Sequence, residues 1–197
     1  MIKTEDAAGV YPPSEDSFLL LEAVRYAKGD VLDLFAGSGI VGLSAAKKAD
    51  NVVLADINEN AIKSINRNAE LNRITNYKAV KSNFFSKLGG RRFDVIYMNP
   101  PYLPGARREG DELDAATLGG ENGYEITISA INELKRHLKP DGVAFLILSD
   151  VYEVSKVYKA LESINFKFKV VDTKKFFFEE LILVRIYEKR GHSPYKR

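Results

Sequence analysis

The sequence predicts an α/β fold: a mostly parallel sheet of seven strands, with helices on both faces and an antiparallel strand pair at the C-terminal end. Apolar runs rich in β-branched residues alternate with helical patterns between residues 31 and 164. This alternation is typical of a parallel sheet with helical crossovers. Two further alternating runs, 166–171 and 180–187, are joined by a turn around 174–178, so we expect them to pair antiparallel.

Composition limits the size and class of the protein. A chain of 197 residues with 45% hydrophobic content is long enough for one well-filled core, so we expect a single domain. Its parts are an N-terminal arm and helix (1–27), the α/β core (28–190) and a basic tail (191–197). Lysine and arginine number 29 against 27 acidic residues, and the net charge of +2 neither requires nor excludes a nucleic acid.

Several function classes are disfavoured by what the chain lacks. There is no cysteine, and His137 and His192 are far apart in the sequence, so we predict no metal site. No apolar run reaches the length of about 18 residues that spans a bilayer, and no charged leader precedes an apolar segment. We therefore expect a soluble, cytoplasmic protein without membrane association.

The N-terminal segment is predicted to be an irregular arm (1–10), followed by the stiff stretch Tyr11-Pro12-Pro13. Ser14-Glu15-Asp16-Ser17 then begins a helix, with a hydroxyl for the cap and two carboxylates beside the positive helix end. The helix is apolar over most of its circumference as far as Val24, which predicts burial. Taken alone, capping is enough to explain the four residues at its start.

The first predicted strand, 31–35, leads into a glycine-rich turn. Gly37-Ser38-Gly39-Ile40-Val41-Gly42 satisfies the G-x-G-x-x-G spacing, with a strand before it and a helix after it. The strand 51–55 ends on Asp56, at the spacing of about 20 residues at which a carboxylate binds ribose hydroxyls. The glycine spacing alone also fits a turn without a ligand, but together these features indicate a nucleoside-containing ligand.

A helix over 58–71 and a strand over 77–81 follow. Asn83 and Phe84 come directly after that strand. An amide that donates and accepts hydrogen bonds, beside a flat ring, suits an adenine. A polar loop residue next to a core phenylalanine explains the same pair without any ligand.

The strand 93–98 is apolar enough to be buried on both faces, and it stops at Asn99-Pro100-Pro101. Asn99 is therefore placed at the carboxyl end of a buried strand, where open α/β sheets bind ligands. Elsewhere an Asn-Pro pair is often only a turn. Here the glycine turn, Asp56, Asn83 and Asn99 all follow strand ends, so we expect them to converge on one crevice.

The segment 103–123 lacks periodicity and is rich in glycine and charge. A structureless loop of this length is typical of a lid or a binding loop, and a solvated insertion is the alternative. After it, we expect helices over 124–138 and 152–164 and a buried strand over 143–148.

These motifs resemble those of class I S-adenosylmethionine-dependent methyltransferases that act on exocyclic or amide nitrogens, which implies a Rossmann-like fold. The motifs are Val31 to Gly39, Asp56, Asn83-Phe84 and Asn99-Pro100-Pro101-Tyr102. The segment from Tyr11 to Leu20 is similar to the HemK2/Mtq2 branch of the HemK family, the eukaryotic and archaeal protein-glutamine N5-methyltransferases. The resemblance covers nearly the whole chain.

The resemblance implies that Ser17, Asp33 and the glycine turn hold the methionine part of S-adenosylmethionine. It also implies that Asp56 binds the ribose. Family members often have glycine in place of Phe35 and aspartate in place of Asn83, so these two positions depart from the pattern. The cofactor-binding residues implied in this way are Ser17, Asp33, Phe35, Gly37, Gly39, Asp56, Asn83, Phe84 and Asn99.

The same resemblance implies that Asn99, Pro100 and Tyr102 are catalytic. The Asn99 side-chain oxygen and the Pro100 carbonyl would accept the two amide N–H bonds, and Tyr102 would pack against the amide plane. The implied substrate is the glutamine of the Gly-Gly-Gln motif in a class I translation release factor. The implied partner is a small zinc-binding activator of the Trm112 type, which we expect to cover an apolar edge of the sheet.

Three alternatives remain open. A DNA or RNA adenine-N6 methyltransferase shares the Asn-Pro-Pro-Tyr motif, although no target-recognition domain is evident. An NAD-dependent dehydrogenase shares the glycine turn and Asp56 but needs hydride-transfer residues and a second domain. A non-catalytic scaffold with a methyltransferase fold needs neither Asn99 nor Asp56 intact.

Overall fold

A computed structural model describes residues 2–106 and 116–188 of the chain. The predicted basic tail (191–197) lies outside these residues, and so does the part of the predicted loop from 107 to 115. The elements are α1 (Glu15–Leu21), a 3-10 helix η1 (Glu22–Tyr26), β1 (Asp30–Leu34), α2 (Ile40–Ala45), β2 (Asn51–Asp56), α3 (Glu59–Leu71), β3 (Tyr77–Lys81), β4 (Phe93–Met98), β5 (Leu103–Pro104), β6 (Leu118–Gly120), α5 (Glu125–His137), β7 (Leu138–Ser149), α6 (Val154–Ser163), β8 (Phe166–Lys175) and β9 (Glu180–Glu188).

The main sheet confirms the predicted architecture. It has seven strands in the order β3-β2-β1-β4-β7-β9-β8. Neighbouring strands are parallel in the pairs β3–β2, β2–β1, β1–β4 and β4–β7. Strand β9 pairs antiparallel with both β7 and β8. The strand order reverses between β1 and β4, and ligands bind outside the carboxyl ends of the strands at such a point.

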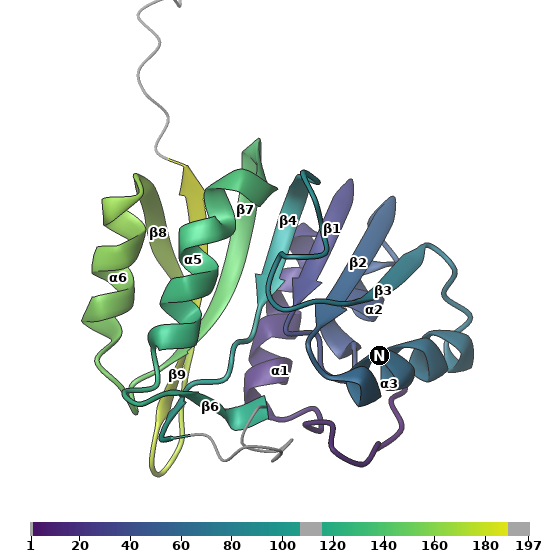
Figure 1. Ribbon diagram of the computed structural model, residues 1–197, viewed down its shortest axis with the longest axis horizontal. Helices are drawn as coiled ribbons and strands as arrows, with labels where there is room; N and C mark the ends of the chain where they lie inside the picture. The colour runs from purple at the N-terminus through teal and green to yellow at the C-terminus, as the bar shows by residue number, and fades with distance from the viewer. Residues whose placement is uncertain (1, 107–115, 189–197) are drawn as a thin grey trace, which may run out of the picture.

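Helices cover both faces of the sheet, as predicted (Figure 1). One apolar core lies between the sheet and α1, α2 and α3, and includes Leu19, Leu43 and Ile65. The second lies between the sheet and α5 and α6, and includes Ile131 and Leu161. Because both faces of the central strands are buried, these strands are almost continuously apolar, and Val95, Ile96 and Tyr97 are each 0% exposed.

Several element boundaries differ from the sequence prediction. The first helix becomes a 3-10 helix at Glu22, and the Ser14 side chain makes no capping hydrogen bond. The helix after the glycine turn ends at Ala45, a few residues early. The strand expected from 143 begins at Leu138 instead, because the chain leaves α5 directly into pairing with Phe93 of β4.

The loop predicted over 103–123 is not structureless in its described parts. Leu103 pairs with Leu118 and Pro104 with Gly120, so β5 and β6 form a second, two-stranded sheet. The Gly105 N–H also donates to the Gly120 carbonyl, at 2.9 Å. The segment that follows Asn99 is thus tied to the segment that precedes α5.

The N-terminal arm is irregular, as predicted, but it is pinned to α3 by asparagine side chains. Asn72 Oδ1 accepts from the Lys3 N–H at 2.9 Å, and Asn68 Oδ1 accepts from the Glu5 N–H at 3.0 Å. Asn58 Nδ2 donates to the Gly9 carbonyl at 2.6 Å. These contacts bring the following residues, Val10 and Tyr11, to the carboxyl ends of the strands.

Within the described part of the chain, no helix combines the length and the apolar character that crossing a bilayer requires.

Candidate active site

A cavity of about 170 Å³ lies at the carboxyl ends of β1, β2 and β4, where the motifs were expected to converge. Most of the predicted site residues line it. These are Ser17, Asp33, Phe35, Gly37, Asp56, Asn99, Pro100 and Tyr102. Gly39, Asn83 and Phe84 are not among the residues that line the cavity.

Two carboxylates, those of Asp33 and Asp56, line this cavity. Asp33, 3% exposed, accepts a hydrogen bond from the Gly42 N–H at 2.7 Å. Burial raises the pKa of Asp33 to about 8; the Gly42 N–H opposes this shift and the charge of Asp56 adds to it. Asp56 accepts from the N–H groups of Gly37 and Asn58 at 2.8 and 2.9 Å, and burial also raises its pKa.

The glycines of the turn have different tasks. Gly37 has a φ of +51°, and a Cβ on it would meet nothing closer than the Tyr11 carbonyl at 3.9 Å, so the backbone there faces open space. A Cβ on Gly42 would instead lie 2.7 Å from Leu54 and 2.9 Å from Asp33, because α2 packs closely on the sheet. Gly37 therefore leaves room for a ligand, whereas Gly42 serves packing.

Asn99 carries an unsatisfied polar atom. Its side-chain oxygen is buried, at the end of β4, and finds no hydrogen-bond partner among the described residues. Buried acceptors without partners are uncommon and costly, by roughly 1–3 kcal/mol each. Tyr102 lies on the same cavity wall, where burial, and then the charges of Asp16 and Glu179, raise its pKa.

Phe35 and Phe84 form an edge-to-face aromatic pair, with ring centroids 5.6 Å apart. Both have a left-handed backbone, with φ of 66° and 49°. Phe35 lines the cavity and Phe84 supports it from behind, while the Asn83 side chain is exposed. The proposed adenine contacts of Asn83 and Phe84 therefore stay predictions.

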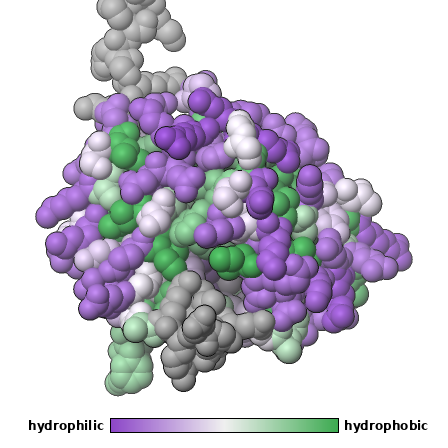
Figure 2. Space-filling model, viewed as in Figure 1, coloured by the Kyte–Doolittle hydropathy of each residue, from purple (hydrophilic) through white to green (hydrophobic). Residues whose placement is uncertain are grey.

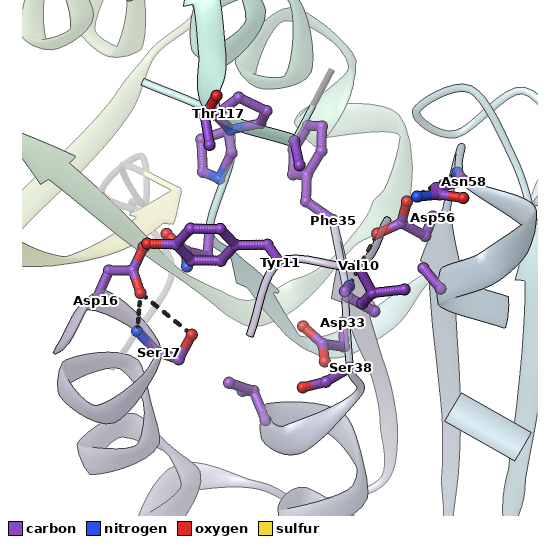
Figure 3. Close-up of a pocket in the computed structure, with 18 of the residues that line it drawn as sticks. Val10, Tyr11, Asp16, Ser17, Asp33, Phe35, Ser38, Asp56, Asn58 and Thr117 are labelled. Atoms are coloured by element: carbon purple, nitrogen blue, oxygen red, sulfur yellow. Dashed lines mark hydrogen bonds between the residues drawn. The ribbon is translucent and has the colours of Figure 1, made fainter. Parts of the chain in front are cut away.

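The N-terminal wall of the cavity contains residues that sequence analysis had not assigned to the site. Asp16 is 4% exposed and accepts hydrogen bonds from the N–H and the hydroxyl of Ser17. Figure 3 shows the Tyr11 hydroxyl pointing toward this carboxylate, and burial followed by the charge of Asp16 raises the pKa of Tyr11. A signal was present: Asp16 precedes the fully buried Leu19 and Leu20 by three and four residues, so it lies on the buried face of α1.

A glycine-rich brace behind the Asn-Pro-Pro-Tyr motif was also missed. A Cβ on Gly119 would lie 2.7 Å from the Pro101 carbonyl oxygen, and one on Gly123 would lie 2.5 Å from that of Tyr102. The backbone on either side of Gly120 is thus in close contact with the backbone that follows Asn99. The glycines of this segment had been interpreted only as loop residues.

The electrostatics of the cavity favour a positively charged ligand. Asp16, Asp33 and Asp56 all line it, and none of its described lining residues is a lysine or an arginine. Uncompensated carboxylates in a partly desolvated pocket attract a cation and repel phosphates. S-adenosylmethionine fits this arrangement, since it carries a sulfonium and an ammonium group together with ribose hydroxyls that a carboxylate can bind.

Comparison with known proteins identifies the family. Residues 14–178 match the family model described as methyltransferase small domain. A protein of Methanocaldococcus jannaschii named putative protein N5-glutamine methyltransferase is 37% identical over 182 residues, which cover 90% of this chain and 91% of that protein. The release factor glutamine methyltransferase of Clostridium acetobutylicum is 34% identical over 195 residues. That match covers 86% of this chain but only 64% of the Clostridium protein.

Among solved structures, the fold is similar to that of the E. cuniculi Mtq2-Trm112 complex, described as responsible for methylation of the translation termination factor eRF1. The TM-score is 0.73 at 20% identity, and the match covers 92% of this chain and 99% of that chain. The predictions of a Rossmann-like methyltransferase fold and of S-adenosylmethionine as the cofactor are confirmed. The chain belongs to the methyltransferase small domain family, among the protein N5-glutamine methyltransferases.

Proposed function

We propose that this enzyme transfers a methyl group from S-adenosylmethionine to the side-chain nitrogen of the Gly-Gly-Gln glutamine in a class I translation release factor. The observation that carries the proposal is the buried side-chain oxygen of Asn99, which has no hydrogen-bond partner among residues 2–106 and 116–188, at the wall of a cavity suited to a cationic cofactor. A substrate amide N–H is the group that this oxygen lacks. The relatives named as glutamine methyltransferases support the same substrate class.

The residues of the site have distinct roles in this proposal. Asp56 binds the ribose hydroxyls of the cofactor, while Asp33, Ser17 and the backbone around Gly37 hold its methionine end. The buried Asp16 carboxylate adds a further acceptor next to Ser17. The pKa of Asp33, raised to about 8 in the free protein, falls when a cationic group binds beside it, because an opposite charge favours the ionised form.

The chemistry needs orientation more than it needs a strong base. An amide nitrogen is a weak nucleophile because its lone pair is delocalised into the carbonyl. When bound, the cofactor supplies an electrophilic methyl group on a positively charged sulfur. The Asn99 oxygen and the Pro100 carbonyl accept the two amide N–H bonds, and Tyr102 packs against the amide plane. Alignment of this kind can account for ~7–11 kcal/mol of barrier.

We also propose a small zinc-binding partner of the Trm112 type, and the cytoplasm, where release factors act, as the place of action. The partner proposal is supported by the fold shared with the Mtq2-Trm112 complex. Isolation of a monodisperse chain that is fully active without any partner contradicts an obligatory partner.

The experiment that tests the substrate uses a cofactor with a labelled methyl group. The full chain, alone and with a Trm112-type protein, is incubated with a release factor, with the same factor carrying alanine in place of its Gly-Gly-Gln glutamine, and with DNA and RNA. We expect label only on the unaltered release factor. Label on the altered factor contradicts the assigned glutamine, and label on nucleic acid favours the adenine-N6 alternative. Calorimetry that finds no binding of S-adenosylmethionine favours the scaffold.

A further inference from the structure

The turn between β8 and β9 carries three consecutive phenylalanines that the core does not use. Phe176 is 39% exposed, Phe177 92% and Phe178 89%. In Figure 2 an apolar group projects from the surface where Figure 1 places this turn. Large exposed apolar groups with charged neighbours are typical of interaction sites. We call Phe176–Phe178 the aromatic tip.

The aromatic tip is held in place by its own turn. β8 and β9 pair as far as Lys175 and Glu180, and the Phe176 N–H donates to the Glu179 carbonyl at 2.8 Å. The rings of Phe177 and Phe178 contact each other edge to face, with centroids 4.7 Å apart at 83°. Two rings that are already positioned lose little conformational freedom when a partner covers them.

The aromatic tip also adjoins the active site. Because β9 runs antiparallel to β7, the turn before β9 lies at the carboxyl end of β7. The cavity lies at this same end of the sheet. Glu179, directly after the tip, accepts from the Ser149 hydroxyl at 2.9 Å. Its charge contributes to the raised pKa values of Tyr11 and Tyr102, after burial and Asp16, and both tyrosines line the cavity.

We propose that the aromatic tip docks the protein substrate, by inserting Phe177 and Phe178 into an apolar surface beside the segment that carries the target glutamine. The inference rests on the proposed function. A protein substrate is much larger than the side chain that enters the cavity, so the rest of it lies on the surface around the opening. The tip stands at the same end of the sheet, directly before Glu179, whose charge acts on Tyr11 and Tyr102 in the cavity. Lys174, Lys175, Glu179 and Glu180 flank the rings in the sequence, a pattern typical of an apolar binding anchor with a polar border.

The other occupants of such a surface are less consistent with its place. A permanent partner seated on the tip would cover surface at the end of the sheet that the incoming substrate also has to approach. A second copy of the chain would do the same. A substrate anchored there instead gains affinity from contacts remote from the reacting atoms, and that binding energy helps to position the amide.

The test replaces both exposed rings in the full chain, as Phe177→Ser with Phe178→Ser, and compares it with Leu71→Ser. Leu71 is 44% exposed at the end of α3. This helix packs on β2 and β3, and β3 is the edge strand farthest from β8 in the sheet. Steady-state kinetics with an intact release factor are measured in the presence of the zinc-binding partner. We expect KM for the release factor to rise on the order of 10- to 100-fold in the double variant, from the apolar area that two rings no longer bury. We expect kcat and cofactor affinity to stay unchanged, and Leu71→Ser to behave as the wild type.

Several results overturn the inference. One is an unchanged KM for the release factor, and another is a fall in kcat without a change in KM. Loss of self-association in sedimentation, or of affinity for the zinc-binding partner, with KM for the release factor unaltered, assigns the tip to that other occupant. If the wild-type chain itself does not label the release factor, the proposed function fails and this inference falls with it.

Discussion

The carboxylates at the two ends of the sheet differ in their surroundings and in the direction of their pKa shifts. At the amino ends of the strands, the Asp30 and Asp94 carboxylates both accept hydrogen bonds from the Lys139 ammonium, at 2.9 and 2.7 Å. The hydrogen bond from Lys139 lowers the pKa of Asp30. At the carboxyl ends, Asp33 is buried and Asp56 is partly buried, and no lysine or arginine is among the described residues that line the cavity with them. Burial raises the pKa values of both carboxylates.

Asp30 and Asp33 belong to the same strand, three residues apart. Asp30 is paired with Lys139 and its side chain is 36% exposed, whereas Asp33 is 3% exposed and has no lysine or arginine near it among the described cavity residues. The difference teaches which end of the fold is built for stability and which is built for binding. Asp33 and Asp56 accept hydrogen bonds from backbone N–H groups, so what a cationic ligand can add is the opposite charge that Lys139 supplies to Asp30.

The largest effect is expected at Asn99. Asn99→Ala removes the acceptor that orients the substrate amide, so we expect kcat to fall by about 10²–10³-fold. Cofactor affinity, measured by calorimetry, should change little. Stability should not fall either, since the variant loses a buried Asn99 oxygen that has no partner among the described residues. Asn51→Ala is the matched control at the amino end, where the Asn51 side chain donates a hydrogen bond to Asp30. Unchanged turnover in Asn99→Ala removes the proposed mechanism.

Asp33 should make the free protein less stable as pH rises. The folded pKa of about 8 lies above the ordinary value of 3.8, so between these values the folded state holds a proton that the unfolded state has released. Unfolding free energy should therefore fall by about 1.4 kcal/mol per pH unit, or about 2.7 kcal/mol from pH 5 to pH 7, through this group. Denaturant titrations of wild type and Asp33→Asn measure the difference. Parallel pH profiles for the two proteins would contradict the raised pKa.

Asp56→Asn should weaken cofactor binding by about 10- to 100-fold, because a charged acceptor of the ribose hydroxyls becomes a neutral amide. The side-chain oxygen that remains can still accept from the Gly37 N–H. Asp94→Asn is the counterpart at the amino end, and we expect it to reduce stability without altering cofactor affinity. Calorimetric titration with S-adenosylmethionine distinguishes the two. Equal affinities in both variants would show that Asp56 does not hold the ribose.

Gly123→Ala should lower kcat by about tenfold with little change in cofactor affinity. Gly123 has a φ of +88°, and its new Cβ would lie 2.5 Å from the Tyr102 carbonyl oxygen, so the backbone after Asn99 has to shift. Gly90→Ala is the reference, because a Cβ there meets nothing within 4 Å. A kcat equal to that of Gly90→Ala would show that the glycine brace does not position the motif.

The smallest effect is expected at the amino end itself. Lys139→Met removes both ion pairs, but the lysine side chain is 36% exposed, so the loss of stability should be about 1 kcal/mol or less and should shrink at high salt. Turnover should not change. A drop in activity would mean that the two ends of the sheet are coupled.

Much of the fold followed from local patterns. The buried strands are short apolar runs bounded by glycine, proline or charge, and the observed β3 and β4 have the bounds predicted for them. The predictions were wrong where chain segments distant in sequence compete. The β5–β6 pairing and the early start of β7 depend on partners that no local window contains.

The sequence by itself determined the order of the strands along the chain, the glycine turn, and the polar residues at the ends of β1, β2 and β4. These depend on periodicity and on chain stiffness, which are properties of neighbouring residues. Only the tertiary structure decided which carboxylates are neutralised, that Asp16 faces the cavity, and that the Asn99 oxygen has no partner in the described part of the chain. The physical reason is that desolvation and pairing are set by whatever packs against a group. For Asp30 that partner is Lys139, which lies 109 residues away in the chain.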